Sequence, residues 1–331
     1  MLLSIIVPVY NIERYIADCL DSLLDQGFGE GELEIICIDN GSTDDSADVI
    51  RNMMDRHPEI TLLTTAVKGV SHARNIGIDN ARGKYLYFCD GDDYLVGNCL
   101  SSIVHALIRT DSATASIGFA SVQEDSHPLP FTKREYTPLT GIKRPFYSGN
   151  IWRFIIRKDI VIENGIRFHE QMSYAEDELF LYHICLHIDF PKHLYYEEPL
   201  YAYRTRSTSA THRKYEEKAL AHTNSMFYLA KDIKRQIDLG IMSEERKRDS
   251  FMRYRIAIAT YLWDRMLEQK KPTETLSFLR SEGMYPFGIE WRLLRPKMLK
   301  TMVINYIKLP FSWEWYYKLI CGLFNRMKGT I

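Results

Sequence analysis

The 331-residue sequence lacks an apolar run of about 18 residues or more, the length that a membrane-spanning helix needs. Its first residues, MLLSIIVPVY, lack the basic start and the cleavage site of a secretory signal peptide. It also lacks a surplus of charge, since 42 Lys and Arg stand against 43 Asp and Glu. A net charge of −1 gives no reason to expect a nucleic-acid partner.

Paired cysteines are absent as well. The six cysteines are scattered, and none belongs to a CxxC motif. Cys37 and Cys89 lie in apolar, strand-like runs, where free buried thiols are common. This pattern is typical of a reducing compartment, so we expect a cytoplasmic protein.

No GxGxxG motif follows the first apolar run, which argues against a dinucleotide-dependent oxidoreductase. What the chain does have is 46% hydrophobic and 26% charged residues, enough for a sizeable folded core. In its first hundred residues, short apolar runs alternate with segments of helical period. The expected strands are 2–7, 34–38, 60–64 and 84–89, and the expected helices are 13–26, 43–56 and 70–81.

This rhythm predicts an α/β fold with a mostly parallel sheet and right-handed crossovers. Ligands of such sheets bind beyond the carboxyl ends of the strands. Three polar turns should meet there: Pro8 to Asn11, Asp39 to Ser42, and Asp90 to Asp93.

The turn Asp90-Gly91-Asp92-Asp93 is the most informative of the three, because its carboxylates repel one another. A divalent cation that also binds a polyanionic ligand would relieve this repulsion, and hard oxygen ligands suit Mg²⁺ or Mn²⁺. The alternative is an acidic β-turn that faces water, with Gly91 supplying the bend.

The remaining chain divides at about residue 212. After the acidic turn, we expect a helix over 95–109, a strand over 114–122 and a loop-rich region with one strand near Tyr136. A helix over 172–187, which opens near Glu176-Asp177, and a strand over 194–203 should follow. Glycine becomes sparse after that, and 213–331 is predicted to be helical. The tail over 298–331 mixes aromatic residues with lysines and arginines, which suits a membrane surface, the fold's own core or a homodimer partner.

Five segments together resemble the family 2 glycosyltransferases, inverting enzymes of the GT-A fold found in bacterial polysaccharide biosynthesis. They are VPVYN at 7–11, IDNGSTD at 38–44, GVSHARNIG at 69–77, DGDD at 90–93 and Glu176-Asp177. The resemblance covers about residues 2–210. It implies a GT-A domain over 1–212, with a nucleotide-sugar half (1–97) and an acceptor half (98–212), and a helical extension over 213–331.

The resemblance also assigns donor-binding roles. Pro8, Val9 and Tyr10 would form the wall against the nucleoside, and Asp39 would accept a hydrogen bond from the uracil N–H. Asn40 stands where the family often has a second aspartate, which weakens the case for a ribose contact. Alternatively, Pro8 ends its strand and Asp39 caps the following helix.

Arg74 would neutralise the diphosphate or orient a residue of the acidic turn, or else form a structural salt bridge with Asp90 or Asp92. Asp92 and Asp90 would form the site for Mn²⁺ or Mg²⁺, with Asp92 as the direct ligand and Asp90 facing the ribose or a metal-bound water. Asp90 and Gly91 would also contact the nucleotide sugar. Asp93 would orient the other carboxylates.

Beside Glu176, Asp177 would act as the general base, taking a proton from the acceptor hydroxyl. The alternative is that both acids favour a helix N-terminus electrostatically. Arg204 would hold the diphosphate from the far side, and His212 would complete the coordination of the metal.

The expected activity is inverting transfer of a sugar, of the hexosyltransferase type, from a nucleotide diphosphate such as UDP. The acceptor would be a hydroxyl of a glycan or of a lipid-linked saccharide, reached from the cytosolic face of the membrane. Two alternatives stay open: a catalytically inactive scaffold that binds nucleotide sugars, and a nucleotidyltransferase.

Overall fold

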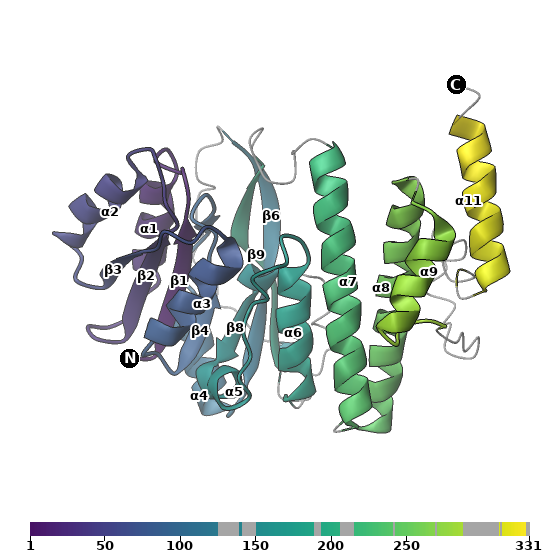
Figure 1. Cartoon of the computed structure of the whole chain (residues 1–331). Helices are drawn as coiled ribbons and strands as arrows, with labels where there is room; N and C mark the ends of the chain where they lie inside the picture. The colour runs from purple at the N-terminus through teal and green to yellow at the C-terminus, as the bar shows by residue number, and fades with distance from the viewer. Residues whose placement is uncertain are drawn as a thin grey trace. The chain divides into compact units, whose positions relative to one another are not determined.

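The computed structural model describes residues 1–124, 139–140, 150–188, 193–205, 215–240, 242–268, 270–286, 311 and 313–328. The chain divides into two compact units, Met1–Arg213 and Lys214–Ile331, which are described separately below. Figure 1 labels their helices and strands. His212 and the strand expected near Tyr136 lie outside the described residues.

The first unit is built on one sheet with the strand order β3-β2-β1-β4-β8-β6-β9-β5, with β7 paired to β9 (Figure 1). Its strands are β1 (Leu3–Val9), β2 (Leu33–Asp39), β3 (Ile60–Thr64), β4 (Tyr85–Phe88), β5 (Tyr94–Leu95), β6 (Thr114–Gln123), β7 (Leu139–Thr140), β8 (Phe154–Arg157) and β9 (His193–Thr205).

The first four strands are parallel, as the alternation of apolar runs and helices predicted. Beyond them the sheet is mixed, because β8 runs antiparallel to both β4 and β6. The expected end of the first strand at Pro8 is wrong, since β1 continues through Pro8 to Val9 in register with β2. Pairing with β4 stops at Ile6, so Pro8 removes no N–H from that ladder.

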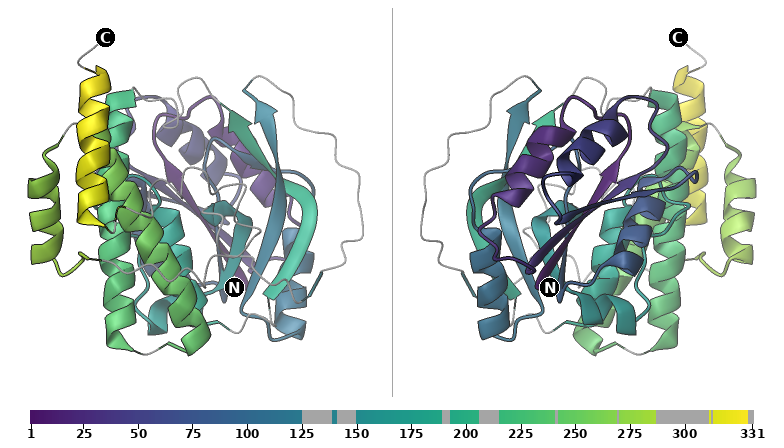
Figure 2. Two further views of the ribbon diagram at one scale, coloured as in Figure 1. Left: turned by 90° about the vertical axis from the view of Figure 1, so that its right-hand side faces the viewer. Right: turned by 90° about the vertical axis from the view of Figure 1, so that its left-hand side faces the viewer.

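Helices cover both faces of this sheet (Figure 2). On one face pack α1 (Ile16–Leu24), α2 (Ser46–Met54) and α4 (Leu100–Arg109). On the other face pack α3 (Val70–Asn80), α5 (Lys158–Glu163) and α6 (Glu176–Leu186). The helix expected over 95–109 begins only at Leu100, because Tyr94 and Leu95 pair with β9 as β5. At Gly77, a Cβ atom would lie 2.3 Å from Ile6, so only glycine lets α3 pack this closely on β1.

The second unit is helical in its described part. Its helices are α7 (Tyr215–Leu239), α8 (Glu244–Leu267), α9 (Pro272–Ser281) and α11 (Glu314–Lys328). Within this unit α7 packs along α8, and α9 contacts both α8 and α11. In the residues that the structure describes, no helix is long and apolar enough to cross a bilayer.

Candidate active site

The three polar turns lie where β1, β2 and β4 end, at the carboxyl edge of the sheet. Two of them are tied together: Asn11, with a left-handed φ of 52°, accepts a hydrogen bond at Oδ1 from the Thr43 N–H at 2.8 Å. The Asn11 N–H donates in turn to Ser42 Oγ at 3.1 Å. The loops after β1 and β2 therefore form one rigid wall of the candidate site.

Tyr10 projects from this wall and is 46% exposed, so its ring is available to a planar ligand. The Lys68 ammonium lies 5.4 Å from the centre of that ring. Sequence reasoning missed Lys68; its position just before Gly69, at the start of α3, was the available signal. The predicted role of Val9 in the wall against the nucleoside is wrong, because its side chain is fully buried in the core.

Asp39 lies at the end of β2, where Oδ1 accepts a hydrogen bond from the Ser42 N–H at 3.2 Å. Because α2 begins only at Ser46, with Asp45 before it, Asp39 does not cap that helix, and the capping alternative is wrong. The bond to Ser42 closes a local turn after β2 and involves Oδ1 only. Next to it, the buried amide oxygen of Asn40 has no hydrogen-bond partner in the described structure. A buried acceptor without a donor is unfavourable, so a ligand that donates a hydrogen bond here would stabilise the site.

Arg74 joins the acidic turn to the start of α6. Its guanidinium donates to Asp90 Oδ1 at 3.0 Å, to Glu176 Oε1 at 3.2 Å and to Asp177 Oδ1 at 2.6 Å. We call Arg74, Asp90, Glu176 and Asp177 the ion cluster. Residues separated by about a hundred positions thus meet at one point, with three carboxylates against one guanidinium. The predicted contact of Arg74 with the acidic turn is present.

The ion cluster is largely buried, since the side chain of Arg74 is only 4% exposed. Burial alone would lower the pKa of Arg74, but the charges of Asp177, Asp90 and Glu176 raise it well above its usual value. Phe168 packs under the guanidinium, with its ring centre 5.2 Å away. Arg74 is therefore a permanent cation fixed in place by its neighbours.

Asp177 is held from two sides. Its Oδ1 pairs with Arg74, and its Oδ2 accepts a hydrogen bond from the Ile151 N–H at 3.0 Å. Burial raises the pKa of Asp177 to about 7, against the lowering effect of Arg74 and with a further rise from the charge of Glu176. The residue before this acid pair, Ala175, has a left-handed φ of 57°, a strained conformation of the kind found at functional sites.

Within the acidic turn, Asp93 has a different environment from Asp90. It is buried, and its carboxylate accepts hydrogen bonds from Tyr201 Oη at 2.6 Å and from the Arg204 N–H at 2.7 Å. Burial and the charges of Asp92 and Asp90 raise the pKa of Asp93 to about 8. Asp93 thus anchors the turn to β9, and Tyr201 is a supporting residue that sequence reasoning missed.

Gly91, the second residue of this turn, is buried, and a Cβ atom there would lie 2.5 Å from Ile12 and 3.2 Å from Val7. Its φ is not left-handed, so close packing rather than a bend requires glycine at this position. The guanidinium of Arg204 is also buried: it lies 4.9 Å from the ring centre of Tyr15 and 5.2 Å from that of Tyr94, and it pairs with Asp18 at 3.3 Å. In this arrangement Arg204 supports the fold, and its contact with a diphosphate stays a prediction.

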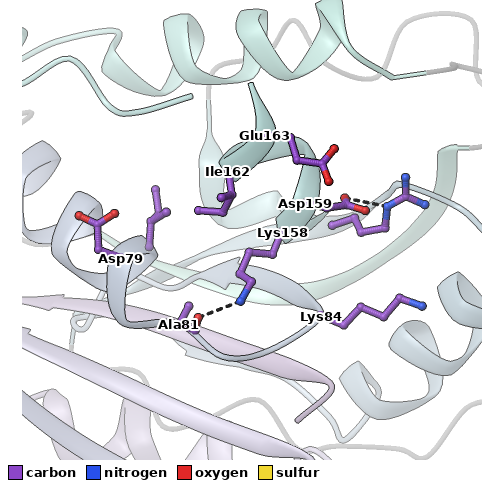
Figure 3. A pocket seen from close by; sticks show the side chains of 9 residues that line it. Asp79, Ala81, Lys84, Lys158, Asp159, Ile162 and Glu163 are labelled. Carbon is purple, nitrogen blue, oxygen red and sulfur yellow. Dashed lines mark hydrogen bonds and ion pairs between the residues drawn. The ribbon is translucent and has the colours of Figure 1, made fainter. Parts of the chain in front are cut away.

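A hollow of about 450 Å³ lies elsewhere on the first unit, at the amino end of β4 (Figure 3). Lys84, Lys158, Asp79 and Glu163 contribute to its lining, and Lys158 Nζ donates to the Ala81 carbonyl at 3.0 Å. None of the predicted site residues lines this hollow, so it is separate from the candidate active site.

Comparison with known proteins identifies the family. Residues 4–169 match the sequence profile of glycosyl transferase family 2. The chain belongs to this family. It is 30% identical over 236 residues to the uncharacterized glycosyltransferase EpsJ of Bacillus subtilis. The matched region covers 68% of this chain and 67% of EpsJ. It is 38% identical over 185 residues to a poly(ribitol-phosphate) beta-glucosyltransferase of Bacillus spizizenii, which covers 54% of this chain and 29% of that enzyme.

Solved structures give the same fold. The crystal structure of Staphylococcus aureus TarS residues 1–349 in complex with UDP-GlcNAc aligns with a TM-score of 0.65 and 20% identity, over 96% of this chain and 91% of that one. A second TarS structure, in complex with UDP, aligns with a TM-score of 0.64. The predicted GT-A fold and the assignment as a glycosyltransferase are thus confirmed.

Replacing Tyr201 with Phe should lower the free energy of unfolding of this glycosyltransferase by about 1–3 kcal/mol, because the buried Asp93 loses a hydrogen-bond donor. The turn that carries Asp92 should also become less ordered and bind donor nucleotide more weakly. Denaturant unfolding and calorimetry measure the two effects. Tyr203→Phe is the matched control, because Tyr201 and Tyr203 both stack on Trp152, with ring centres 4.2 and 5.8 Å away. Equal effects of both substitutions would contradict the role of Tyr201.

Proposed function

We propose that this enzyme transfers a sugar from a uridine diphosphate donor to an acceptor hydroxyl, with inversion at the anomeric carbon. The observation that carries the proposal is the ion cluster, which places Asp177 beside the acidic turn at the carboxyl edge of the sheet. A single displacement needs one base and no enzyme nucleophile. Asp177 is the candidate for that base.

Asp177 suits this role because its pKa of about 7 lies near physiological pH. A carboxylate with this pKa is largely ionised in slightly alkaline solution and still basic enough to accept a proton from a hydroxyl. The hydrogen bonds from Arg74 and from the Ile151 N–H fix its orientation. Glu176 shares the same guanidinium and raises the basicity of Asp177 through its charge.

The donor nucleoside would bind at the wall formed by the loops after β1 and β2. The exposed ring of Tyr10, with Lys68 beside it, offers a stacking surface for the base, and Pro8 would line the same wall. Asp39 would accept the uracil N–H, and the unpartnered Asn40 oxygen would accept a ribose hydroxyl. The TarS structures in complex with UDP and UDP-GlcNAc support the choice of uridine.

A divalent cation, Mn²⁺ or Mg²⁺, fits the acidic turn. The ion cluster has three carboxylates against one guanidinium, and Asp92 adds a fourth carboxylate nearby, so the oxygen donors exceed the fixed positive charge. Among the described residues, no group of three or more acidic, His or Cys side chains is arranged to hold a metal ion. The cation would therefore need substrate phosphates as further ligands beside one or two carboxylates, here Asp92 and Asp90. When bound, it would stabilise the charge on the departing nucleoside diphosphate.

The acceptor would be a hydroxyl of a glycan or of a lipid-linked saccharide. The poly(ribitol-phosphate) named for TarS and for the Bacillus spizizenii enzyme supports a polymeric, polyol-containing acceptor. We place the enzyme in the cytoplasm, because its six cysteines are buried thiols that form no disulfide, as in a reducing compartment. A homodimer stays a prediction from the sequence.

The proposal is tested by titrating UDP, GDP and ADP into the protein with and without Mn²⁺ in a calorimeter. We expect UDP to bind most tightly and Mn²⁺ to strengthen that binding at least tenfold, with the gain lost in Asp92→Asn. A panel of UDP-sugars then identifies the donor by metal-dependent hydrolysis. Failure of every nucleotide to bind in the presence of Mn²⁺ would overturn the proposal.

A further inference from the structure

The last described helix, α11, has one face that packs within the second unit. Tyr317 and Cys321 on this face are buried, and Tyr317 Oη donates a hydrogen bond to the Leu262 carbonyl at 3.0 Å. Phe311, just before the helix, is fully buried and contacts the ring of Tyr317, with ring centres 5.0 Å apart. These contacts fix the rotation of α11 about its own axis.

The opposite face of α11 is apolar and exposed. Trp315, Leu319 and Leu323 follow one another at intervals of four residues, so they form a stripe along one side of the helix. They are 63%, 50% and 46% exposed. Trp313 extends this surface, since its ring stacks on that of Trp315 with centres 6.1 Å apart. A continuous apolar stripe on the outer side of a helix is unfavourable in water and marks an interaction surface.

The sequence around this stripe is strongly basic. Residues 291–331 contain eight Lys and Arg and a single acid, Glu314, in a chain whose net charge is −1. The other 290 residues are therefore acidic overall. Glu314 itself pairs with Lys318 at 2.7 Å and with Arg280. The apolar stripe thus lies in a segment of net positive charge.

We propose that α11 docks on an anionic phospholipid surface, with Trp315, Leu319 and Leu323 inserted among the acyl chains, and that the net positive charge of the sequence over 291–331 strengthens this binding. Tryptophan together with lysine and arginine is typical of helices that lie in a membrane interface. A second copy of the chain fits this surface less well, because two basic segments would repel each other. This proposal concerns where the enzyme works and does not depend on the transfer mechanism.

The test is sedimentation of the 331-residue protein with vesicles of phosphatidylcholine alone, or with an added fraction of phosphatidylglycerol. We expect binding to the anionic vesicles and a loss of that binding at high salt. In the triple variant Trp315→Ser, Leu319→Gln, Leu323→Gln, the affinity for anionic vesicles should fall by about tenfold or more, because affinity follows the apolar area that is inserted. The matched control is Ile108→Gln with Leu239→Gln, which removes exposed apolar side chains from α4 and α7.

Three results would overturn the proposal. The first is equal binding to neutral and anionic vesicles, and the second is unchanged binding by the triple variant. The third is a protein that does not bind vesicles but forms a homodimer in light scattering, with the triple variant monomeric. Circular dichroism and thermal unfolding establish that the variants are folded. Binding of UDP to each variant, measured in the same preparations, separates failure of this proposal from failure of the proposed enzymatic function.

Discussion

Asp177→Asn is expected to lower the rate of sugar transfer by about 10²- to 10⁴-fold while UDP binding persists, because the amide cannot accept the proton of the acceptor hydroxyl. The variant keeps the shape of the side chain, so the packing around Ile151 should be preserved. Rates of transfer are measured with the donor identified by the nucleotide-sugar panel. Wild-type activity in Asp177→Asn would remove this residue from the mechanism.

A matched control lies one residue away. Glu178→Gln makes the same chemical change in the same first turn of α6. If the acids only stabilised the start of the helix, both substitutions would act alike. We expect Glu178→Gln to retain most of the activity.

The pH profile gives a second readout of the same role. The base is active when ionised, and the pKa of Asp177 is about 7, so kcat/KM should be constant above that pH. Below it, protonation of Asp177 should lower kcat/KM by about tenfold per pH unit. The residual activity of Asp177→Asn should lack this dependence.

Arg74→Ala should destabilise the protein by about 3–5 kcal/mol at neutral pH, because it leaves the carboxylates of a buried ion cluster without their counter-charge. Arg74 lowers the pKa of Asp177, which burial raises, so removing Arg74 raises that pKa further. Asp177 then binds more protons in the folded state than in the unfolded state, so the stability of the variant should improve as the pH falls. Denaturant unfolding at several pH values measures both effects.

Two further variants separate the charge of Arg74 from the shape of its guanidinium and compare the ion cluster with a more exposed ion pair. Arg74→Lys keeps one charge but loses the planar fork that reaches three carboxylates, so an intermediate loss is expected. Arg167→Ala removes an arginine from a more exposed pair with Asp79, at 2.8 Å, and should change stability by about 0–1 kcal/mol. If Arg74→Ala were no more harmful than Arg167→Ala, the ion cluster would not be a structural element.

Sequence reasoning predicted the first half of the sheet well because local patterns determine it. Short, β-branched apolar runs such as Ile35 to Ile38, bounded by polar turns, are typical of buried strands, and the acids after β4 follow it to the carboxyl edge. The long-range pairs were not predictable in this way. Nothing local indicates that β8 inserts between β4 and β6, or that Tyr201 reaches back to Asp93.

The candidate site shows the same division. Residue types and order sufficed to select Arg74, Asp90, Glu176 and Asp177, which the structure brings together. The direction in which a side chain points was not predictable. Val9 alternates into the core while its neighbour Tyr10 faces outward, and a buried Arg204 is indistinguishable in sequence from an exposed one.

The strand order also determines how the catalytic unit can be taken apart. β8 covers the side of β4 that faces away from β1, and β5, which lies before residue 98, pairs among the described strands with β9 from the other end of the unit. A fragment that stopped at residue 97 would expose the hydrogen-bonding groups of β4 and leave β5 without a neighbour. Donor recognition therefore cannot be isolated as a small autonomous module, and a fragment used for binding studies must extend through β9.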